Sequence, residues 1–202
     1  MQRIGILGGT FDPPHIGHLV LAEYAAEALN FSQVLFVPAA TPPHKNDVRT
    51  PIEHRLNMLQ LAIRDNERFV ISRVDIDRPG PHYTVDMIGI IQGQYPHAEL
   101  YFVMGGDSLR DLPKWNRPQD LIRRCRLAVF QRPDMVETVT ADMHEAVLPG
   151  LAERVDIIDA PLLGFSSTEI AQRRYDGKSI RYLVTDAVLQ YIYDNQLYRK
   201  ML

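Results

Sequence analysis

The chain has 202 residues, of which 46% are hydrophobic and 23% are charged, and its formal net charge is -3. This composition is typical of a globular protein with a substantial core, and it argues against a disordered or low-complexity chain. Nucleic acids and membrane surfaces usually select a strongly basic surface, so neither is an expected partner, and any phosphate-binding site must be local.

Cys125 is the only cysteine, which rules out an intramolecular disulfide and favours a reducing compartment. The first residues lack the apolar stretch of a signal peptide, and no run of about 18 apolar residues indicates a membrane span. We therefore expect a cytoplasmic protein.

Short apolar runs alternate with helical periodicities along the chain. The runs that predict buried strands are residues 4–7, 33–37, 69–71, 99–104, 127–130 and 155–158. Helices are expected over 19–29, 51–63 and 84–91, as short pieces within 111–124, and after 166 and 185. Thr84 is the expected N-cap of its helix, and 135–148 is expected to be mostly helix or loop.

This alternation predicts an α/β fold in which a doubly wound, mainly parallel sheet carries helices on both faces. Ligands of such sheets bind beyond the carboxyl ends of the strands. We expect a single domain, 1–202, in which 160–202 forms a C-terminal helical subregion packed on the rest.

A glycine-rich turn follows the first strand, in the segment Gly8-Gly9-Thr10-Phe11-Asp12-Pro13-Pro14-His15-Ile16-Gly17-His18. Glycines let backbone N–H groups approach an anion, and the N-terminus of the next helix offers further donors. Imidazoles at this positive helix end are sensible partners of an anion. The segment predicts a phosphate site, although His15 and His18 as ordinary capping or core residues remain the alternative.

Other nucleotide and metal motifs fit less well. The turn lacks the Gly-x-Gly-x-x-Gly pattern of dinucleotide folds, and Gln172 stands where a P-loop ending in Gly177-Lys178-Ser179 needs glycine. A zinc site from His15, His18 and His44 is weakly supported, because the chain has one cysteine and the histidine pair has no nearby glutamate.

The first motif resembles that of the nucleotidyltransferase superfamily that shares His-x-Gly-His with class I aminoacyl-tRNA synthetases, and Phe165-Ser166-Ser167-Thr168-Glu169-Ile170 resembles its second, phosphate-binding element. Within it, the chain is similar to the bacterial nicotinate mononucleotide adenylyltransferases over nearly its whole length. The further matching segments are Pro42-Pro43-His44-Lys45, Tyr83-Thr84-Val85-Asp86, Gly105-x-Asp107-Ser108-Leu109, Leu112-Pro113-x-Trp115 and Ser179-Ile180-Arg181-Tyr182-Leu183-Val184.

The resemblance implies transfer of AMP from ATP to nicotinate mononucleotide, with pyrophosphate as the second product, in NAD biosynthesis. It makes His15 and His18 the catalytic pair and assigns the ATP contacts to Gly8, Gly9, Thr10, Phe11, Gly105, Asp107, Ser166, Ser167 and Thr168. The implied acceptor contacts are His44, Lys45, Tyr83, Thr84, Trp115, Asn116 and Arg132. The sequence shows no compact carboxylate cluster for Mg²⁺, so the ion is expected to be held mainly by ATP phosphates and water.

One position departs from the family pattern. The second motif usually continues Ser-Ser-Thr-x-Ile-Arg, and here Ala171 replaces the arginine. Arg174 lies nearly one helical turn further on a similar face, whereas Arg173 points to another side, so our hypothesis is that Arg174 binds ATP instead. Asp12 is interpreted as the turn-forming residue of Asp-Pro.

Two other functions remain open at this point. A sister adenylyltransferase would use nicotinamide mononucleotide or phosphopantetheine as acceptor, and a nucleotide-binding sensor would keep the fold but lose turnover. The sequence leaves the oligomeric state open, a homo-oligomer included.

Overall fold

The computed structural model describes residues 1–40, 50–131, 138–161 and 163–200. Within these ranges, six strands form one sheet in the order β3-β2-β1-β4-β5-β6. The strands are β1 (Gln2–Gly9), β2 (Gln33–Pro38), β3 (Phe69–Ile71), β4 (Ala98–Gly105), β5 (Arg126–Gln131) and β6 (Val155–Asp159). All neighbours pair in parallel, so the predicted doubly wound sheet and its predicted strands are confirmed.

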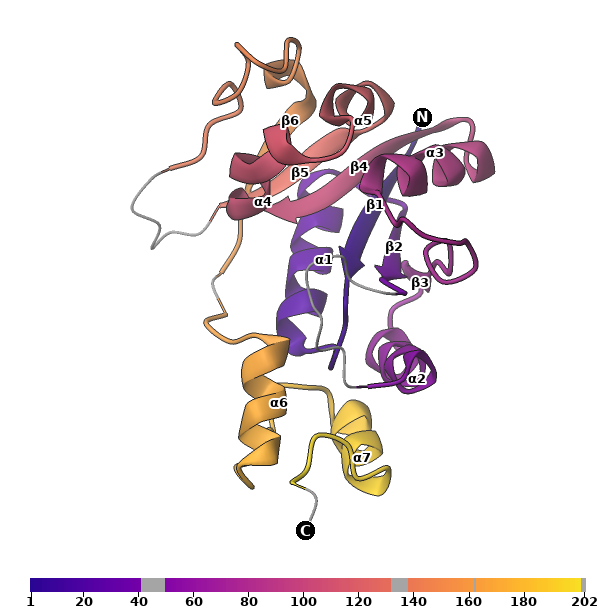
Figure 1. Ribbon diagram of the computed structural model, residues 1–202, viewed down its shortest axis with the longest axis vertical. Helices are drawn as coiled ribbons and strands as arrows, with labels where there is room; N and C mark the ends of the chain where they lie inside the picture. The colour runs from indigo at the N-terminus through magenta and orange to yellow at the C-terminus, as the bar shows by residue number, and fades with distance from the viewer. Residues whose placement is uncertain (41–49, 132–137, 162, 201–202) are drawn as a thin grey trace.

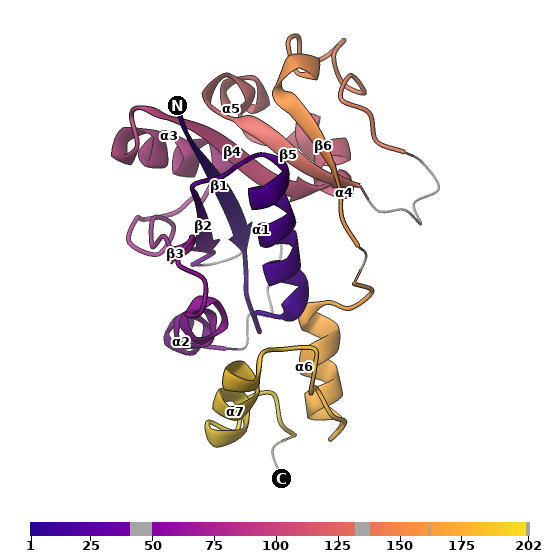
Figure 2. The same cartoon turned by 180° about the vertical axis from the view of Figure 1, so that it is seen from behind.

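Helices cover both faces of this sheet. They are α1 (Ile16–Ala28), α2 (Ile52–Ile63), α3 (Thr84–Gln94), α4 (Gly106–Asp111), α5 (Pro118–Arg124), α6 (Ser167–Tyr175) and α7 (Asp186–Asp194), with the 3₁₀ turns Leu112–Lys114 and Ala152–Arg154. Figure 1 shows α3, α4 and α5 on one face, and Figure 2 shows α1 on the other. No helix within the described ranges is both long and apolar enough to cross a bilayer.

Two local predictions concern the start of α3 and the segment 135–148. Tyr83, not Thr84, is the N-cap of α3, and Thr84 is the first residue of the helix, so the predicted cap was one residue too late. The described part of the 135–148 segment, from residue 138 onward, forms turns.

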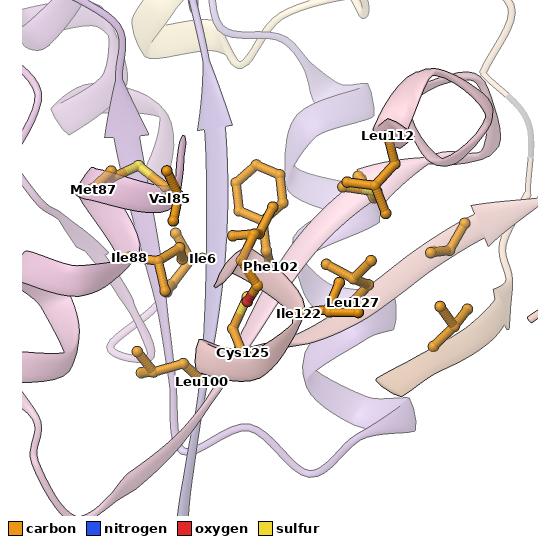
Figure 3. Close-up of a cluster of buried hydrophobic side chains, with 14 of the residues drawn as sticks. Ile6, Val85, Met87, Ile88, Leu100, Phe102, Leu112, Ile122, Cys125 and Leu127 are labelled. Carbon is orange, nitrogen blue, oxygen red and sulfur yellow. The ribbon is translucent and has the colours of Figure 1, made fainter. Parts of the chain in front are cut away.

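A cluster of buried apolar side chains lies between the sheet and α3, α4 and α5. Figure 3 shows Ile6 of β1 and Phe102 of β4 beside Ile88 of α3 and Ile122 of α5. Cys125 is 3% exposed in this cluster, and burial raises the pKa of its thiol to about 12. Cys125 is therefore a core residue, because a buried thiol with a raised pKa is a poor nucleophile.

Helix α7 packs on α2, and α6 lies next to the start of α1 (Figure 1). One buried cluster joins Met58 of α2 to Ile170, Ile180, Val184, Val188 and Ile192. These residues are at most 3% exposed, so the cluster gives the C-terminal region a substantial share of buried apolar surface. We propose that 1–202 unfolds as one domain, with 160–202 as a packed subregion.

The substitution Ile192→Ala tests this proposal. Loss of a fully buried isoleucine should lower the free energy of unfolding by about 2–5 kcal/mol in urea denaturation, in one cooperative transition. The exposed residue Val147 offers a matched control, because Val147→Ala should change stability by less than about 0.5 kcal/mol. A separate early transition of the C-terminal helices would contradict the single domain.

Candidate active site

The turn after β1 brings two imidazole rings together. His15 is the N-cap residue of α1, and His18 lies in the first turn of that helix. The rings stack with 3.7 Å between their centres and an interplanar angle of 26°. The structure thus places the two predicted histidines side by side at the helix start.

One hydrogen bond decides which nitrogen of His18 carries the proton. The backbone N–H of His15 donates to Nδ1 of His18 at 3.1 Å. Because Nδ1 is the acceptor, the neutral ring carries its proton on Nε2. His18 can therefore donate a hydrogen bond from Nε2, as a phosphate oxygen requires.

His15 is uncharged because it is buried. The residue is 9% exposed, and burial lowers the pKa of its imidazole from 6.5 to about 4. Phe165 contacts the ring edge-on at 5.4 Å between ring centres, and a Cβ on Gly17 would come within 2.9 Å of it. Nδ1 of His15 has no hydrogen-bond partner among the described residues. Since buried polar atoms are nearly always paired, Nδ1 is an atom that a ligand can satisfy.

Phe11 contacts the ring of His18 edge-on. Its backbone is left-handed, with φ of 50°, and the residue as a whole is 1% exposed. The ring lies 5.0 Å from the His18 ring and 5.8 Å from Phe36, measured between centres, and a Cβ on Gly9 would approach it to 3.0 Å. Only the backbone N–H of Phe11 is thus suited to the predicted phosphate contact.

The second predicted motif lies directly against the first. The hydroxyl of Ser167 donates to the carbonyl of Pro13 at 2.8 Å, across 154 residues of sequence. The N–H of Ile16 donates to the carbonyl of Leu183 at 2.9 Å. Figure 1 accordingly shows the start of α6 beside the start of α1. The fold therefore assembles one site from the two ends of the chain.

Two of the three hydroxyls at the start of α6 that are predicted to serve ATP already make a hydrogen bond within the protein. Ser166 caps the helix, since its hydroxyl oxygen accepts from the N–H of Glu169 at 3.2 Å. Ser167 is engaged by Pro13. Thr168 is exposed, so its hydroxyl, the O–H of Ser166 and the N–H groups of the first turn are the candidate donors.

A cavity of about 300 Å³ lies at the carboxyl ends of β1 and β4. The strand order reverses between these strands, which is where doubly wound sheets bind their ligands. Gly8, Gly105 and Trp115 line the cavity, and Trp115 contacts Phe102 edge-on at 6.0 Å between ring centres. An aromatic side chain next to glycines, whose backbone no side chain covers, is suited to bind a flat heterocycle. Asp107 follows Gly105 on α4 with a largely exposed carboxylate.

The predicted acceptor residues that the structure describes fall on two neighbouring loops. Arg78 shapes the first, because it pairs with Asp75 and donates to the carbonyls of Pro81 at 3.1 Å and Tyr83 at 3.2 Å. Thr84 then begins α3. The sequence analysis did not identify Arg78 as the residue that orders this loop.

The second acceptor loop contains Trp115 and Asn116. The side-chain oxygen of Asn116 accepts from Nε of Arg117 at 3.0 Å, and Arg117 also pairs with Asp86 of α3. That ion pair ties the second loop to the helix that begins at Thr84. The two halves of the predicted acceptor site are therefore adjacent.

Arg174, which was predicted to replace the arginine missing at Ala171, contacts another helix in the structure. The guanidinium carbon of Arg174 lies over the ring of Tyr193 in α7, 4.4 Å from its centre. Arg174 also sits in the last turn of α6, about 10 Å of helix rise beyond Ser167. Arg173 donates to the carbonyl of Ser179 at 3.1 Å. Both arginines thus hold the C-terminal region together.

Three predicted residues lie outside the described ranges, namely His44, Lys45 and Arg132, so their contacts with the acceptor remain predictions. Over the ranges that are described, no three His, Cys, Asp or Glu side chains converge in a way that could hold a metal ion.

Sequence analysis missed a polar cluster behind the turn. Arg55 of α2 is 1% exposed and donates to three backbone carbonyls, including that of Thr10 at 2.8 Å. Asp12 accepts a hydrogen bond from the hydroxyl of Tyr198, so it does more than form the predicted Asp-Pro turn. The available signal was spacing, since Arg55 stands four residues before Leu59, on the apolar face of α2.

Comparisons with known proteins agree with this geometry. A model of the cytidylyltransferase-like family matches residues 6–173. The chain is 46% identical to a "probable nicotinate-nucleotide adenylyltransferase" of Thermomicrobium roseum, over 98% of this chain and 92% of the relative. The chain belongs to the nicotinate-nucleotide adenylyltransferase family.

Another relative also aligns with nearly the whole chain. A protein of Thermus thermophilus with the same name is 43% identical over 98% of this chain and 100% of its own length. Two structures of the nicotinic acid mononucleotide adenylyltransferase of Plasmodium falciparum, complexed with APC and with NaAD, have TM-scores of 0.76 and 0.77. Each covers 98% of both chains, at 19% and 20% identity, so this likeness shows the fold.

The lowered pKa of His15 predicts a pH-dependent stability for this adenylyltransferase. Between pH 6.5 and about 4 the unfolded chain binds a proton that the folded chain does not, so stability is fully present above about 6.5 and falls as pH drops toward 4. Between these pH values the free energy of unfolding, measured in urea, should fall by roughly 3 kcal/mol less in the variant His15→Gln than in the original protein. Identical pH profiles for both proteins would contradict the assignment.

Proposed function

We propose that this chain transfers the adenylyl group of ATP to nicotinate mononucleotide, which gives nicotinate adenine dinucleotide and pyrophosphate in NAD biosynthesis. The observation that carries the proposal is the His15–His18 pair, held between the starts of α1 and α6. Curated relatives that span the whole chain and bear the name nicotinate-nucleotide adenylyltransferase support the same reaction.

The chemistry requires little from the protein beyond positioning and charge stabilisation. An oxygen of the acceptor phosphate attacks the α-phosphorus of ATP, the bond to the bridging oxygen breaks, and pyrophosphate leaves. The attacking phosphate is already anionic at neutral pH, so no strong base is needed. Nε2–H of His18 and the N–H groups at the two helix starts can donate to oxygens on which charge develops.

His15 supplies a second, conditional interaction in this proposal. Burial keeps its imidazole neutral without ligand, and an adjacent phosphate favours the protonated form. Binding of ATP next to His15 would therefore raise the pKa of the imidazole again.

ATP is expected to bind as its magnesium complex. Because the described residues offer no three-ligand cluster, phosphate oxygens and water would hold the ion, as is usual for Mg²⁺. On the acceptor side, Trp115 would stack on the pyridine ring, and His44, Lys45 and Arg132 would meet the phosphate. A cytoplasmic location and a homo-oligomer remain predictions.

An acceptor panel tests the proposal. Pyrophosphate release should occur with ATP and nicotinate mononucleotide, and should be much slower with nicotinamide mononucleotide or phosphopantetheine. Activity with phosphopantetheine alone would contradict the proposed acceptor. Binding of ATP without turnover on any acceptor would support a nucleotide sensor instead.

The same assay with His18→Ala tests the role of the histidine. Loss of one donor that acts in the transition state should lower kcat by a factor of a hundred or more, about 3 kcal/mol. His97 is exposed and outside the site, so His97→Ala should leave kcat unchanged. Near-normal turnover of a folded His18→Ala protein would count against the mechanism.

A further inference from the structure

A single buried guanidinium joins the ends of two neighbouring strands. Arg55 donates to the carbonyl of Thr10, just past β1, and to the carbonyls of Ala39 and Ala40, just past β2. The three distances are 2.8, 2.8 and 3.2 Å. These contacts fix the exit of β1, where the ATP motif begins, relative to the exit of β2, where the predicted acceptor segment follows in sequence.

The hydrogen bond from Arg55 to the carbonyl of Thr10 also determines where the next N–H group points. In a trans peptide the C=O of one residue and the N–H of the next point in opposite directions. The carbonyl of Thr10 points at Arg55, so the N–H of Phe11 points away from Arg55. That N–H belongs to the group of donors predicted to hold the ATP phosphates.

The C-terminal segment reaches the same cluster. The hydroxyl of Tyr198, past the end of α7, donates to the carboxylate of Asp12. Burial and the neighbouring carboxylate raise the pKa of Tyr198, so the hydroxyl stays protonated and remains a donor. Asp12 also interacts electrostatically with Arg55, which opposes the effect of burial on the guanidinium.

A charged residue at this position is not explained by stability alone. Burying a guanidinium is costly, and well-packed apolar replacements of buried ions are often neutral or stabilising. An apolar side chain would fill the space but could not turn a carbonyl toward itself. The arrangement is therefore better explained by orientation of the backbone than by packing.

We propose that Arg55 and Tyr198 are positioning residues for ATP: Arg55 aims the Phe11 N–H at the phosphates, and Tyr198 holds the turn in that shape through Asp12. This inference rests on the proposed function, because it takes the turn to be the phosphate site. It assigns an indirect part in ATP binding to Tyr198, which lies 186 residues from Asp12 in the sequence.

The decisive comparison is Tyr198→Phe against Tyr191→Phe. Each removes one hydroxyl from the C-terminal region, but that of Tyr191 contacts only His54 and Asn57 of α2 among the described residues, at 2.9 and 3.0 Å. Titration calorimetry with a non-hydrolysable ATP analogue should show affinity lowered at least fivefold in Tyr198→Phe and by less than twofold in Tyr191→Phe, at similar melting temperatures. Equal affinities in the two variants would overturn the role of Tyr198.

Arg55→Lys tests the guanidinium, because lysine keeps the charge but loses the fork that reaches several carbonyls. It should lower affinity for the ATP analogue at least tenfold in protein that still melts cooperatively, and a change of less than twofold would overturn the role of Arg55. Binding is measured without acceptor, so the result does not depend on which acceptor is used. Failure of the original protein to bind the analogue would refute the phosphate site itself, whereas binding without adenylyl transfer would refute only the proposed reaction.

Discussion

The turn between β1 and α1 is held by contacts from distant parts of the chain, and the candidate site depends on that hold. The contacts are Arg55 with Thr10, Ser167 with Pro13, Leu183 with Ile16 and Tyr198 with Asp12. Each contact pairs a polar group of the turn or of its neighbours. Leaving such a group buried and unpaired would lower the stability of the fold by roughly 1–3 kcal/mol. Together they allow one backbone shape, and that shape places both imidazoles.

Fixed dipoles supply most of the electrostatic character of the described site. Burial lowers the pKa of His15, Nδ1 of His18 accepts from the backbone, and Arg173 and Arg174 are engaged within the C-terminal region. Preoriented dipoles need no rearrangement when charge develops on a phosphate. Such a site suits a substrate that arrives with its own magnesium ion, and it agrees with a chain whose net charge is -3.

The fold and the histidine pair could be predicted because their signals are local. Apolar runs of three to six residues marked the buried strands, and one continuous segment contained both imidazoles. The rest depended on contacts between distant residues. Helical spacing alone placed Arg174 on the face of Ala171, but α7 brings Tyr193 beneath it, and nothing near Asp12 pointed to Tyr198.

The central claim is that the turn makes His18 a donor through Nε2 before any substrate binds. Nitrogen-15 NMR of the histidine-labelled protein at pH 7.5 measures this directly, because the two ring nitrogens differ strongly in chemical shift between tautomers. The account predicts that His18 carries its proton on Nε2, with Nδ1 as an acceptor, and that the variant His18→Ala removes these signals. A His18 ring protonated on Nδ1 would contradict the account, since the N–H of His15 could not then donate to it.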